Sequence, residues 1–218
     1  MTIEPTAVLP GTIAEALRAS IIAQADAPGA TITEAAVALR FGVTRPTARI
    51  AIDRLVADGI LRREPHHAAR VPELSRADIV DLFDNRAVVE GAALAALATG
   101  GTIPAAALAA HHRLIEAADN GEHFARDDIA FHRALVAGQS SPRLTRMHAL
   151  LMGEIELCIG QVDAAGLLTA TAVAVQHQGI LNAVVAGDAP LAERLTRDHV
   201  LGSRDRLLAH VDSRPPAN

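Results

Sequence analysis

The sequence predicts a mostly α-helical protein in two parts: a winged helix-turn-helix over residues 1–72, followed by an all-helical antiparallel bundle over residues 73–218. Three observations support this fold class. Apolar residues follow helical spacing in three short stretches before residue 57, two strand-like runs lie between residues 60 and 71, and helical spacing then continues to residue 211. Hydrophobic residues make up 50% of the 218 residues, which is enough to bury a core in each part.

The first part is predicted to begin with three helices. Apolar spacing predicts a first helix over residues 13–25, which the turn residues 26–29 close. Thr33 and Thr44 are residue types that favour the N-cap position, and they predict the starts of a second and a third helix on either side of Gly42. A helix, a tight turn and a second capped helix are typical of a helix-turn-helix.

A β-hairpin and a helical bundle are predicted to follow. Residues 60–63 and 69–71 have the composition of two short strands, which would form the wing. Beyond Pro72 we expect six helices, over residues 75–99, 104–119, 122–138, 142–160, 171–187 and 189–211. Short breaks with turn residues separate them, and helices joined by short loops pack antiparallel.

Composition excludes several classes of protein. The net charge of −5 argues against a protein that is coated with nucleic acid. The single cysteine, Cys158, excludes an internal disulfide framework and a cysteine-rich zinc site. The N-terminus lacks the layout of a signal peptide, and no apolar run approaches the roughly 20 residues of a membrane span. We therefore expect a cytoplasmic protein with no membrane partner.

The start of the third predicted helix carries candidate DNA contacts. A recognition helix lies in the major groove and offers the side chains of its first turns to the bases. Arginine can bind guanine through two hydrogen bonds, and threonine can bind a phosphate or a base. The predicted contacts are Thr44, Arg45, Thr47 and Arg49, with Arg70 of the hairpin on the flanking backbone or minor groove. The alternative is a solvated helix with scattered arginines.

This part of the chain resembles the GntR family of winged-helix regulators. The family pattern is matched by Pro28-Gly29, by Ile32-Thr33-Glu34, by Phe41-Gly42-Val43-Thr44-Arg45 and by Asp58-Gly59-Ile60-Leu61. Two departures bear on the operator sequence and on the contacts of the wing. Pro46 stands one position earlier than in the family, and the wing tip has His66-His67-Ala68-Ala69 in place of the usual glycine.

The first helix of the bundle carries an arginine and a glutamate on its apolar face. Arg86 and Glu90 share this face with Ile79, Phe83 and Leu97, so both should point inward. A buried arginine is costly unless it is paired. Spacing alone leaves two alternatives: an internal Arg86–Glu90 ion pair, or an Arg86 that binds the carboxylate of a ligand in a two-pronged manner.

Three histidines and one aspartate lie on inward faces of three predicted helices and can converge in the bundle. Asp128 and His132 lie four residues apart on one helix face, and His177 and His199 lie on the apolar faces of two later helices. Imidazole and carboxylate together suit zinc, nickel or manganese. Satisfied core histidines remain the alternative. The remaining pairs with similar spacing lack further ligands, and we expect His66, His67, His111 and His112 to be solvated.

The bundle resembles the FCD ligand-binding domain of the FadR-type branch of GntR regulators. Its motifs are matched by Asp78 to Glu90, by Asp128-Ile129-Ala130-Phe131-His132, by His177 to Val184 and by His199-Val200, with Gln176 where the family usually has glutamate. The resemblance implies that a divalent metal is held at four positions, those of Asp128, His132, His177 and His199. It also implies that Arg86 faces the effector.

Together these features predict a transcription regulator, expected to act as a repressor. A homodimer would bind a palindromic operator in double-stranded DNA, and a small organic acid at the metal and Arg86 would change its affinity. Two alternatives remain. The Asp/His set could serve a metal-dependent hydrolase or lyase, although no general base is evident beside it. The pocket of a DNA-binding regulator could also be purely structural.

Overall fold

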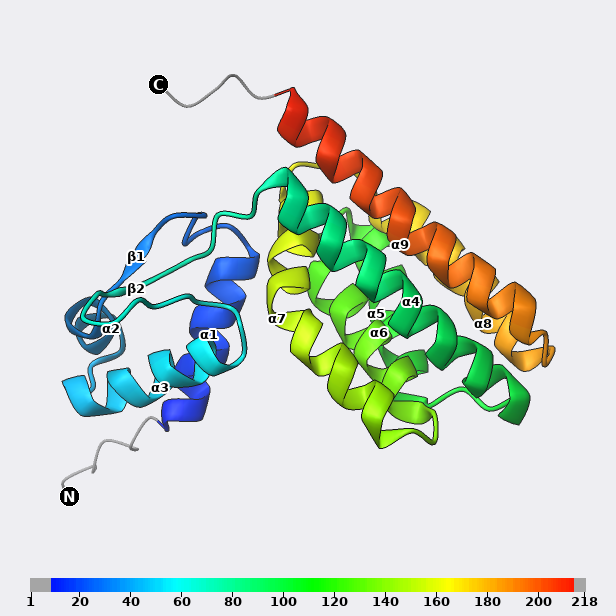
Figure 1. Cartoon of the computed structure of the whole chain (residues 1–218), viewed down its shortest axis with the longest axis horizontal. Coiled ribbons are helices and arrows are strands. Elements are labelled where there is room, and N and C mark those ends of the chain that lie inside the picture. Colours follow the sequence, from blue (N-terminus) through cyan, green and yellow to red (C-terminus); the bar gives the residue numbers. More distant parts are fainter. Residues whose placement is uncertain (1–8, 214–218) are drawn as a thin grey trace. The chain divides into compact units, whose positions relative to one another are not determined.

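The computed structural model describes residues 9–213, and the chain divides into two compact units between Glu73 and Leu74. The elements of the first unit are α1 (Pro10–Ile22), β1 (Thr31–Ile32), α2 (Glu34–Phe41), α3 (Arg45–Ala57) and β2 (Ala69–Arg70). Those of the second are α4 (Arg76–Gly100), α5 (Ala105–Asn120), α6 (Ala125–Gly138), α7 (Pro142–Ala164), α8 (Ala170–Val185) and α9 (Ala189–Asp212) (Figure 1). The described chain is thus mostly helical, as predicted.

The three helices of the first unit form where capping and apolar spacing direct them. The hydroxyl of Thr33 accepts a hydrogen bond from the backbone N–H of Ala36 and thereby caps α2. Gly42 ends α2 with a positive φ of 64°, a conformation that costs glycine little. Ile13, Leu17, Ile52 and Leu55 are fully buried between α1 and α3 and build the core of this unit.

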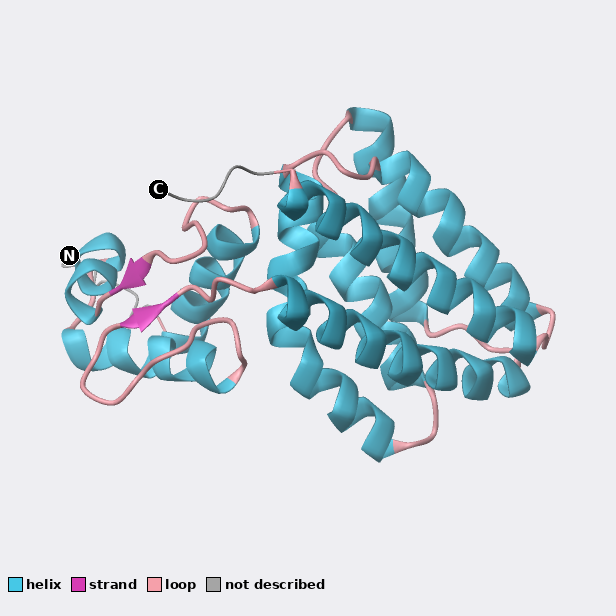
Figure 2. Cartoon of the chain, turned by 45° about the horizontal axis from the view of Figure 1, so that its top comes forward, coloured by secondary structure: helices cyan, strands magenta, loops and turns pink. Residues whose placement is uncertain are grey.

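The small sheet differs from the predicted hairpin. β1 pairs antiparallel with β2, and Thr31 lies opposite Arg70 (Figure 2). The predicted strand over residues 60–63 is wrong except at Arg62, which forms an isolated bridge to Arg70 on the other edge of β2. The β2 segment therefore lies between two partners. The pairing with residues 31–32 joins segments far apart in sequence, which short-range patterns do not reveal.

The six helices of the second unit form one bundle around α4, which packs most extensively against α9 and also contacts α6, α7 and α8 (Figure 1). Because α4 is surrounded, it has buried residues on most of its sides, including Ile79, Phe83, Leu94 and two charged residues described below. Ser75 and Asp78 form a reciprocal capping box at its start. The predicted helices lie within a few residues of these bounds; α6 begins at Ala125 because Gly121 closes α5 in a left-handed turn.

Within residues 9–213, no individual helix has both the length and the apolar composition of a membrane span. Only α4 and α5 taken together meet those criteria, and the two helices are bent by 114° at their junction.

Candidate DNA-binding helix and metal centre

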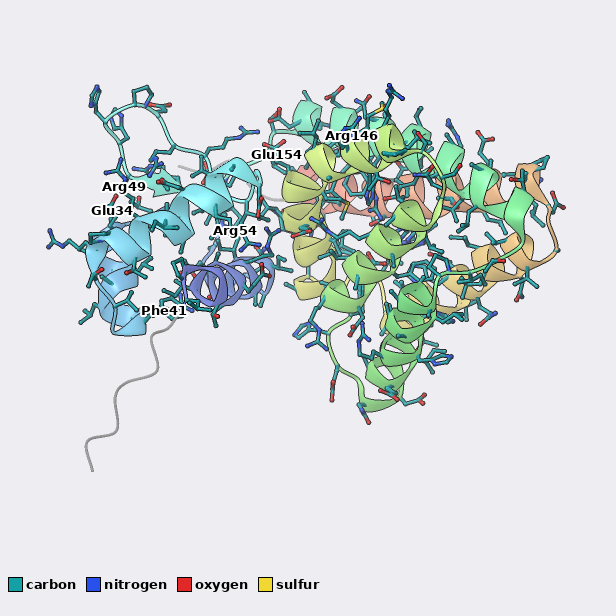
Figure 3. The ribbon with its side chains drawn as sticks, turned by 90° about the horizontal axis from the view of Figure 1, so that it is seen from below. Glu34, Phe41, Arg49, Arg54, Arg146 and Glu154 are labelled. Carbon is teal, nitrogen blue, oxygen red and sulfur yellow. The ribbon has the colours of Figure 1, made fainter. Side chains whose placement is uncertain are left out.

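The predicted DNA contacts lie on the outer face of α3. Arg45 and Arg49 are exposed, and the Nε atom of Arg49 lies 3.9 Å from Glu34 and 3.8 Å from Asp53 (Figure 3). Ion pairs at that length between exposed side chains are weak. Both guanidinium groups are therefore able to reorient towards another anion.

Thr44 and Thr47 form the start of α3. Thr44 is the N-cap, and its hydroxyl accepts from the backbone N–H of Thr47 at 3.3 Å and lies 2.9 Å from the hydroxyl of Thr47. Pro46 fits because it occupies the first turn, where its missing N–H is not needed. The early proline thus leaves the helix intact.

The wing carries Arg70 and a strained tip. Arg70 is exposed, and its Nη1 atom donates to the carbonyl of Gly29 at 3.3 Å. His66 has a positive φ of 66°, the left-handed conformation that disfavours residues with a Cβ atom. The histidine therefore stands at a tip position where glycine would be relaxed.

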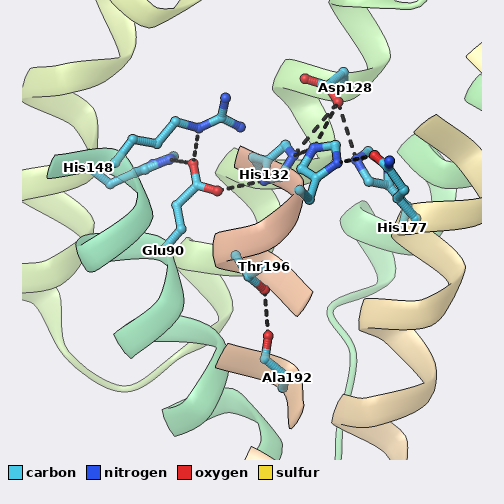
Figure 4. A network of polar contacts seen from close by, with 10 residues as sticks. Glu90, Asp128, His132, His148, His177, Ala192 and Thr196 are labelled. Carbon is cyan, nitrogen blue, oxygen red and sulfur yellow. Dashed lines mark hydrogen bonds and ion pairs between the residues drawn. The ribbon is translucent and has the colours of Figure 1, made fainter. Parts of the chain in front are cut away.

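The four predicted metal ligands are buried and lie close together. Asp128 and His132 project from α6, His177 from α8 and His199 from α9 (Figure 4). The Oδ1 atom of Asp128 lies 3.2 Å from Nε2 of His177, 3.7 Å from Nε2 of His132 and 3.9 Å from Nε2 of His199. The Nε2 atoms of His132 and His199 are 3.2 Å apart. All four distances are below about 4.2 Å, the largest separation of two ligand atoms that each lie about 2.1 Å from one ion.

The outer ring nitrogens of two histidines face acceptors. Nδ1 of His132 lies 2.7 Å from Oε2 of Glu90, and Nδ1 of His199 lies 2.7 Å from Oε1 of Gln176. A carboxylate or amide oxygen only accepts, so we expect both Nδ1 atoms to carry the proton in the neutral rings, although the close contact of His132 with Glu90 lacks the alignment of a hydrogen bond. Their Nε2 lone pairs then point at each other and at Asp128. Such a group of acceptors requires a cation between its members, a proton or a metal ion.

The protonation states of the site suit a metal. Burial lowers the pKa of His177 to about 4, although the carboxylate of Asp128 opposes the shift. Burial, together with His177 and His132, lowers the pKa of His199 well below its usual value. Burial alone would raise the pKa of Asp128, but the neighbouring histidines outweigh it and hold this pKa below its usual value. At neutral pH Asp128 is therefore a carboxylate and His177 and His199 are neutral imidazoles, the forms that bind metals.

Arg86 and Glu90 form a fully buried ion pair beside this cluster. Nε of Arg86 donates to Oε1 of Glu90 at 2.7 Å, and the same oxygen lies 2.9 Å from Nε2 of His148 on α7 (Figure 4). Nη2 of Arg86 is buried and has no hydrogen-bond partner within residues 9–213. The structure thus shows the ion pair that spacing left open, and it also leaves Arg86 with a donor for another acceptor.

His111 corrects one expectation about the remaining histidines. It was expected to be solvated, but it is 2% exposed, and its Nε2 lies 3.1 Å from Oε1 of Gln178 on α8. The reason is that α5 packs against α8 along this side. His66, His67 and His112 are exposed, as expected.

Sequence reasoning missed the outer contacts of the site. Glu90 was recognised only as a partner of Arg86, and neither His148 nor Gln176 was considered as a contact of the cluster. The contacts of Glu90 join α4 to His132 on α6 and His148 on α7, which lie tens of residues further along the chain. The position of Glu90 on the inward face of its helix was the one signal available.

A winged helix-turn-helix followed by a helical domain with a buried cluster of polar side chains is an arrangement typical of DNA-binding regulators, and comparison with known families agrees. The family model "Bacterial regulatory proteins, gntR family" matches residues 9–71, and the model "FCD domain" matches residues 81–202. The chain belongs to the GntR family of transcriptional regulators and carries an FCD domain.

Relatives with recorded roles are regulators as well. The chain is 29% identical to the "Probable D-xylose utilization operon transcriptional repressor" of Paenarthrobacter nicotinovorans, over 82% of this chain and 80% of that protein. It is 32% identical to the HTH-type transcriptional repressor GlaR of Escherichia coli K12, over 70% of this chain and 74% of that protein. These families and relatives are transcriptional regulators, so the chain is a regulator and not the hydrolase or lyase of the alternative reading.

Solved structures show the same fold. A GntR regulator from Rhodococcus sp. RHA1 has a TM-score of 0.78 at 23% identity and covers 92% of this chain and 97% of its own. McbR/YncC of E. coli has a TM-score of 0.74 at 19% identity and covers 94% of this chain and 100% of its own. At these identities the likeness concerns the fold alone.

Proposed function

We propose that the protein is a repressor whose operator affinity responds to a small organic acid bound beside a metal ion. Residues 1–72 bind double-stranded operator DNA, and residues 73–218 bind the metal and the effector. The protein acts in the cytoplasm as a homodimer, with half-sites about one DNA turn apart. The observation that carries the proposal is the buried Asp/His cluster beside an arginine with an unused donor.

The DNA-binding half of the proposal rests on α3. Arg45 and Arg49 extend from the exposed side of its first turns, Thr44 and Thr47 are at its start, and Arg70 extends from the wing. We expect Arg49→Ala to weaken operator binding in a gel-shift assay at moderate salt. Arg54→Ala is the matched control, because Arg54 is half-exposed in the last turn of the same helix. Unchanged binding by Arg49→Ala would contradict the assignment of α3.

The effector half rests on charge. The metal held by Asp128, His132, His177 and His199 is zinc, nickel or manganese; when bound, it supplies positive charge and an open position for a carboxylate oxygen. Arg86 supplies a second cation, whose charge acts on His199. A ligand that lies between two fixed cations is expected to be an anion. The coupling between effector and operator in such regulators is typically ~1–3 kcal/mol.

Elemental analysis and a thermal-shift screen of organic acids test this half. The D-xylose repressor among the relatives directs the screen towards sugar acids first. We expect one divalent ion per chain and an acid that stabilises the native protein more than Arg86→Ala. An acid that stabilises both equally would exclude Arg86 as its anchor. A protein that holds no metal, and whose His132→Ala/His177→Ala variant keeps its fold and its response, would favour a purely structural pocket.

A further inference from the structure

Glu90 is in contact with both halves of the sensing site. Its side chain is fully buried, and each carboxylate oxygen faces a different group. Oε1 accepts from Nε of Arg86 and lies 2.9 Å from His148, whereas Oε2 lies 2.7 Å from Nδ1 of His132 (Figure 4). Arg86 and His132 thus contact the same carboxylate, one at each oxygen.

The contact with His132 has a consequence for the opposite side of the ring. An imidazole that donates from Nδ1 presents the lone pair of Nε2, and Nε2 of His132 is the atom that faces Asp128 and His199. A carboxylate partner on one ring nitrogen also makes the other a stronger metal donor. The ring orientation of His132 and its donor strength therefore both depend on Glu90.

The three histidines of the cluster differ in this outer contact. His132 faces a carboxylate, and His199 faces the amide of Gln176, a weaker acceptor. Nδ1 of His177 and Nδ1 of His132 are both without an aligned hydrogen bond in the described part of the chain, but Nδ1 of His132 has Oε2 of Glu90 at 2.7 Å. The ring of His177 instead stacks on Phe131 at 3.8 Å between centroids. Besides Asp128, which faces all three rings, only His132 has a carboxylate beside its Nδ1 atom among the contacts of these three histidines.

We propose that Glu90 is a positioning residue that links Arg86 to the metal: it orients His132 as a ligand through Oε2, while Arg86 fixes it through Oε1. The inference rests on the proposed metal site and adds to it a defined route between the anion-binding arginine and the metal. A ligand that draws Arg86 away from Oε1 changes the acceptor that His132 faces, and so acts on the metal centre through Glu90 in addition to its own bond to the metal.

Zinc titration of the full chain tests the role of Glu90. Metal is stripped with a chelator, and Zn²⁺ affinity is measured in competition with a chromophoric chelator. We expect the native protein to bind one Zn²⁺, and Glu90→Gln, which keeps the size but loses the charge, to bind about 10- to 100-fold more weakly. Glu156→Gln is the matched control, because Glu156 is a buried carboxylate that accepts from Arg133. Gln176→Ala should weaken Zn²⁺ binding less than Glu90→Gln.

The outcomes separate this inference from the proposed function. A native protein that binds no Zn²⁺, Ni²⁺ or Mn²⁺ would overturn the metal site itself. A native protein that binds Zn²⁺, with a folded Glu90→Gln that binds it equally well, would overturn only the role of Glu90.

The route to Arg86 is tested by a double-mutant cycle. Arg86→Met is expected to tighten Zn²⁺ binding several-fold in the native background. The reason is that the carboxylate of Glu90 no longer accepts from Arg86 and becomes a stronger acceptor for His132. The same change should have little effect in the Glu90→Gln background. Equal effects in the two backgrounds would show that Arg86 acts through its own charge and would overturn the route.

A spectroscopic measurement on the native protein covers the case in which a variant does not fold. Nitrogen NMR of the imidazoles with bound ¹¹³Cd²⁺ reports which ring nitrogen holds the metal. We expect Nε2 of His132 to be coupled to cadmium and Nδ1 to carry a proton in a strong hydrogen bond. Coordination through Nδ1 would be incompatible with the contact to Glu90 and would overturn the proposal.

Discussion

Replacing Arg86 with methionine should destabilise the metal-free protein strongly. The side chains of Arg86 and Glu90 are 1% and 0% exposed, so Glu90 cannot recover hydration when its cationic partner is lost. Breaking a buried ion pair in this way typically costs about 3–5 kcal/mol. The pKa of Glu90 is held well below its usual value because Arg86 and His132 outweigh the effect of burial, so the carboxylate is charged at neutral pH in the native protein.

The loss is measurable by far-UV circular dichroism, which suits a chain without tryptophan or tyrosine. For a protein of this length, 1 kcal/mol shifts the melting temperature by roughly 2–4 °C, so Arg86→Met should melt about 6–20 °C lower. Arg76→Met is the control on the same helix, since Arg76 forms a solvent-exposed pair with Asp212 at 3.5 Å. Exposed pairs contribute about 0–1 kcal/mol.

The pH dependence provides a second check on the same variant. Without Arg86, only His132 and His148 oppose the effect of burial, so the folded-state pKa of Glu90 rises towards the unfolded value of about 4.3. The native protein gains stability as the pH rises through that range and the variant loses most of this gain, so the deficit of the variant should be largest at neutral pH and shrink towards pH about 4. A deficit as small as that of Arg76→Met, or one that does not depend on pH, would refute the idea that Glu90 relies on Arg86.

Three further predictions concern other parts of the molecule. Thr44→Ala removes the N-cap of α3 and should lower stability by about 1 kcal/mol in urea unfolding. His66→Gly relieves the positive φ of the wing tip and should raise stability by up to about 1 kcal/mol; a loss would show that the histidine forms contacts that outweigh strain. Burial lowers the pKa of His177 from 6.5 to about 4, so the metal-free protein should lose stability as pH falls from 6.5 towards 4, with a smaller slope in His177→Gln.

Local patterns were sufficient for most of the helices and for the four residues of the cluster. Asp128 and His132 share a face because four residues make about one helical turn, and His177 and His199 follow the apolar stripes of α8 and α9. Once a stripe is assigned to the core, the polar residues on it must also be inside. Periodicity shows on which face of its helix a residue lies, but not at which level of the bundle. The order of the family motifs suggested that the four side chains meet at one point.

The unpredicted features all depend on contacts between distant segments. β1 forms because residues 31–32 meet residues 69–70, and neither segment is long enough to be recognised alone. His111 is buried because α8 covers α5 at that level. The same holds for His148, which becomes a partner of Glu90 only when α7 packs against α4.

The position of Glu90 explains what α4 contributes to the proposed sensing site. This helix begins at Arg76, directly after the boundary between the two units, and it carries both Arg86 and Glu90 one turn apart. The Asp/His cluster is built on α6, α8 and α9, and the carboxylate of Glu90, 2.7 Å from Nδ1 of His132, gives it a contact with α4. We therefore expect a change at Arg86 or at the proposed metal to act on α4, the first helix after the boundary between the two units. Coupling between an effector and an operator requires an element on which both can act.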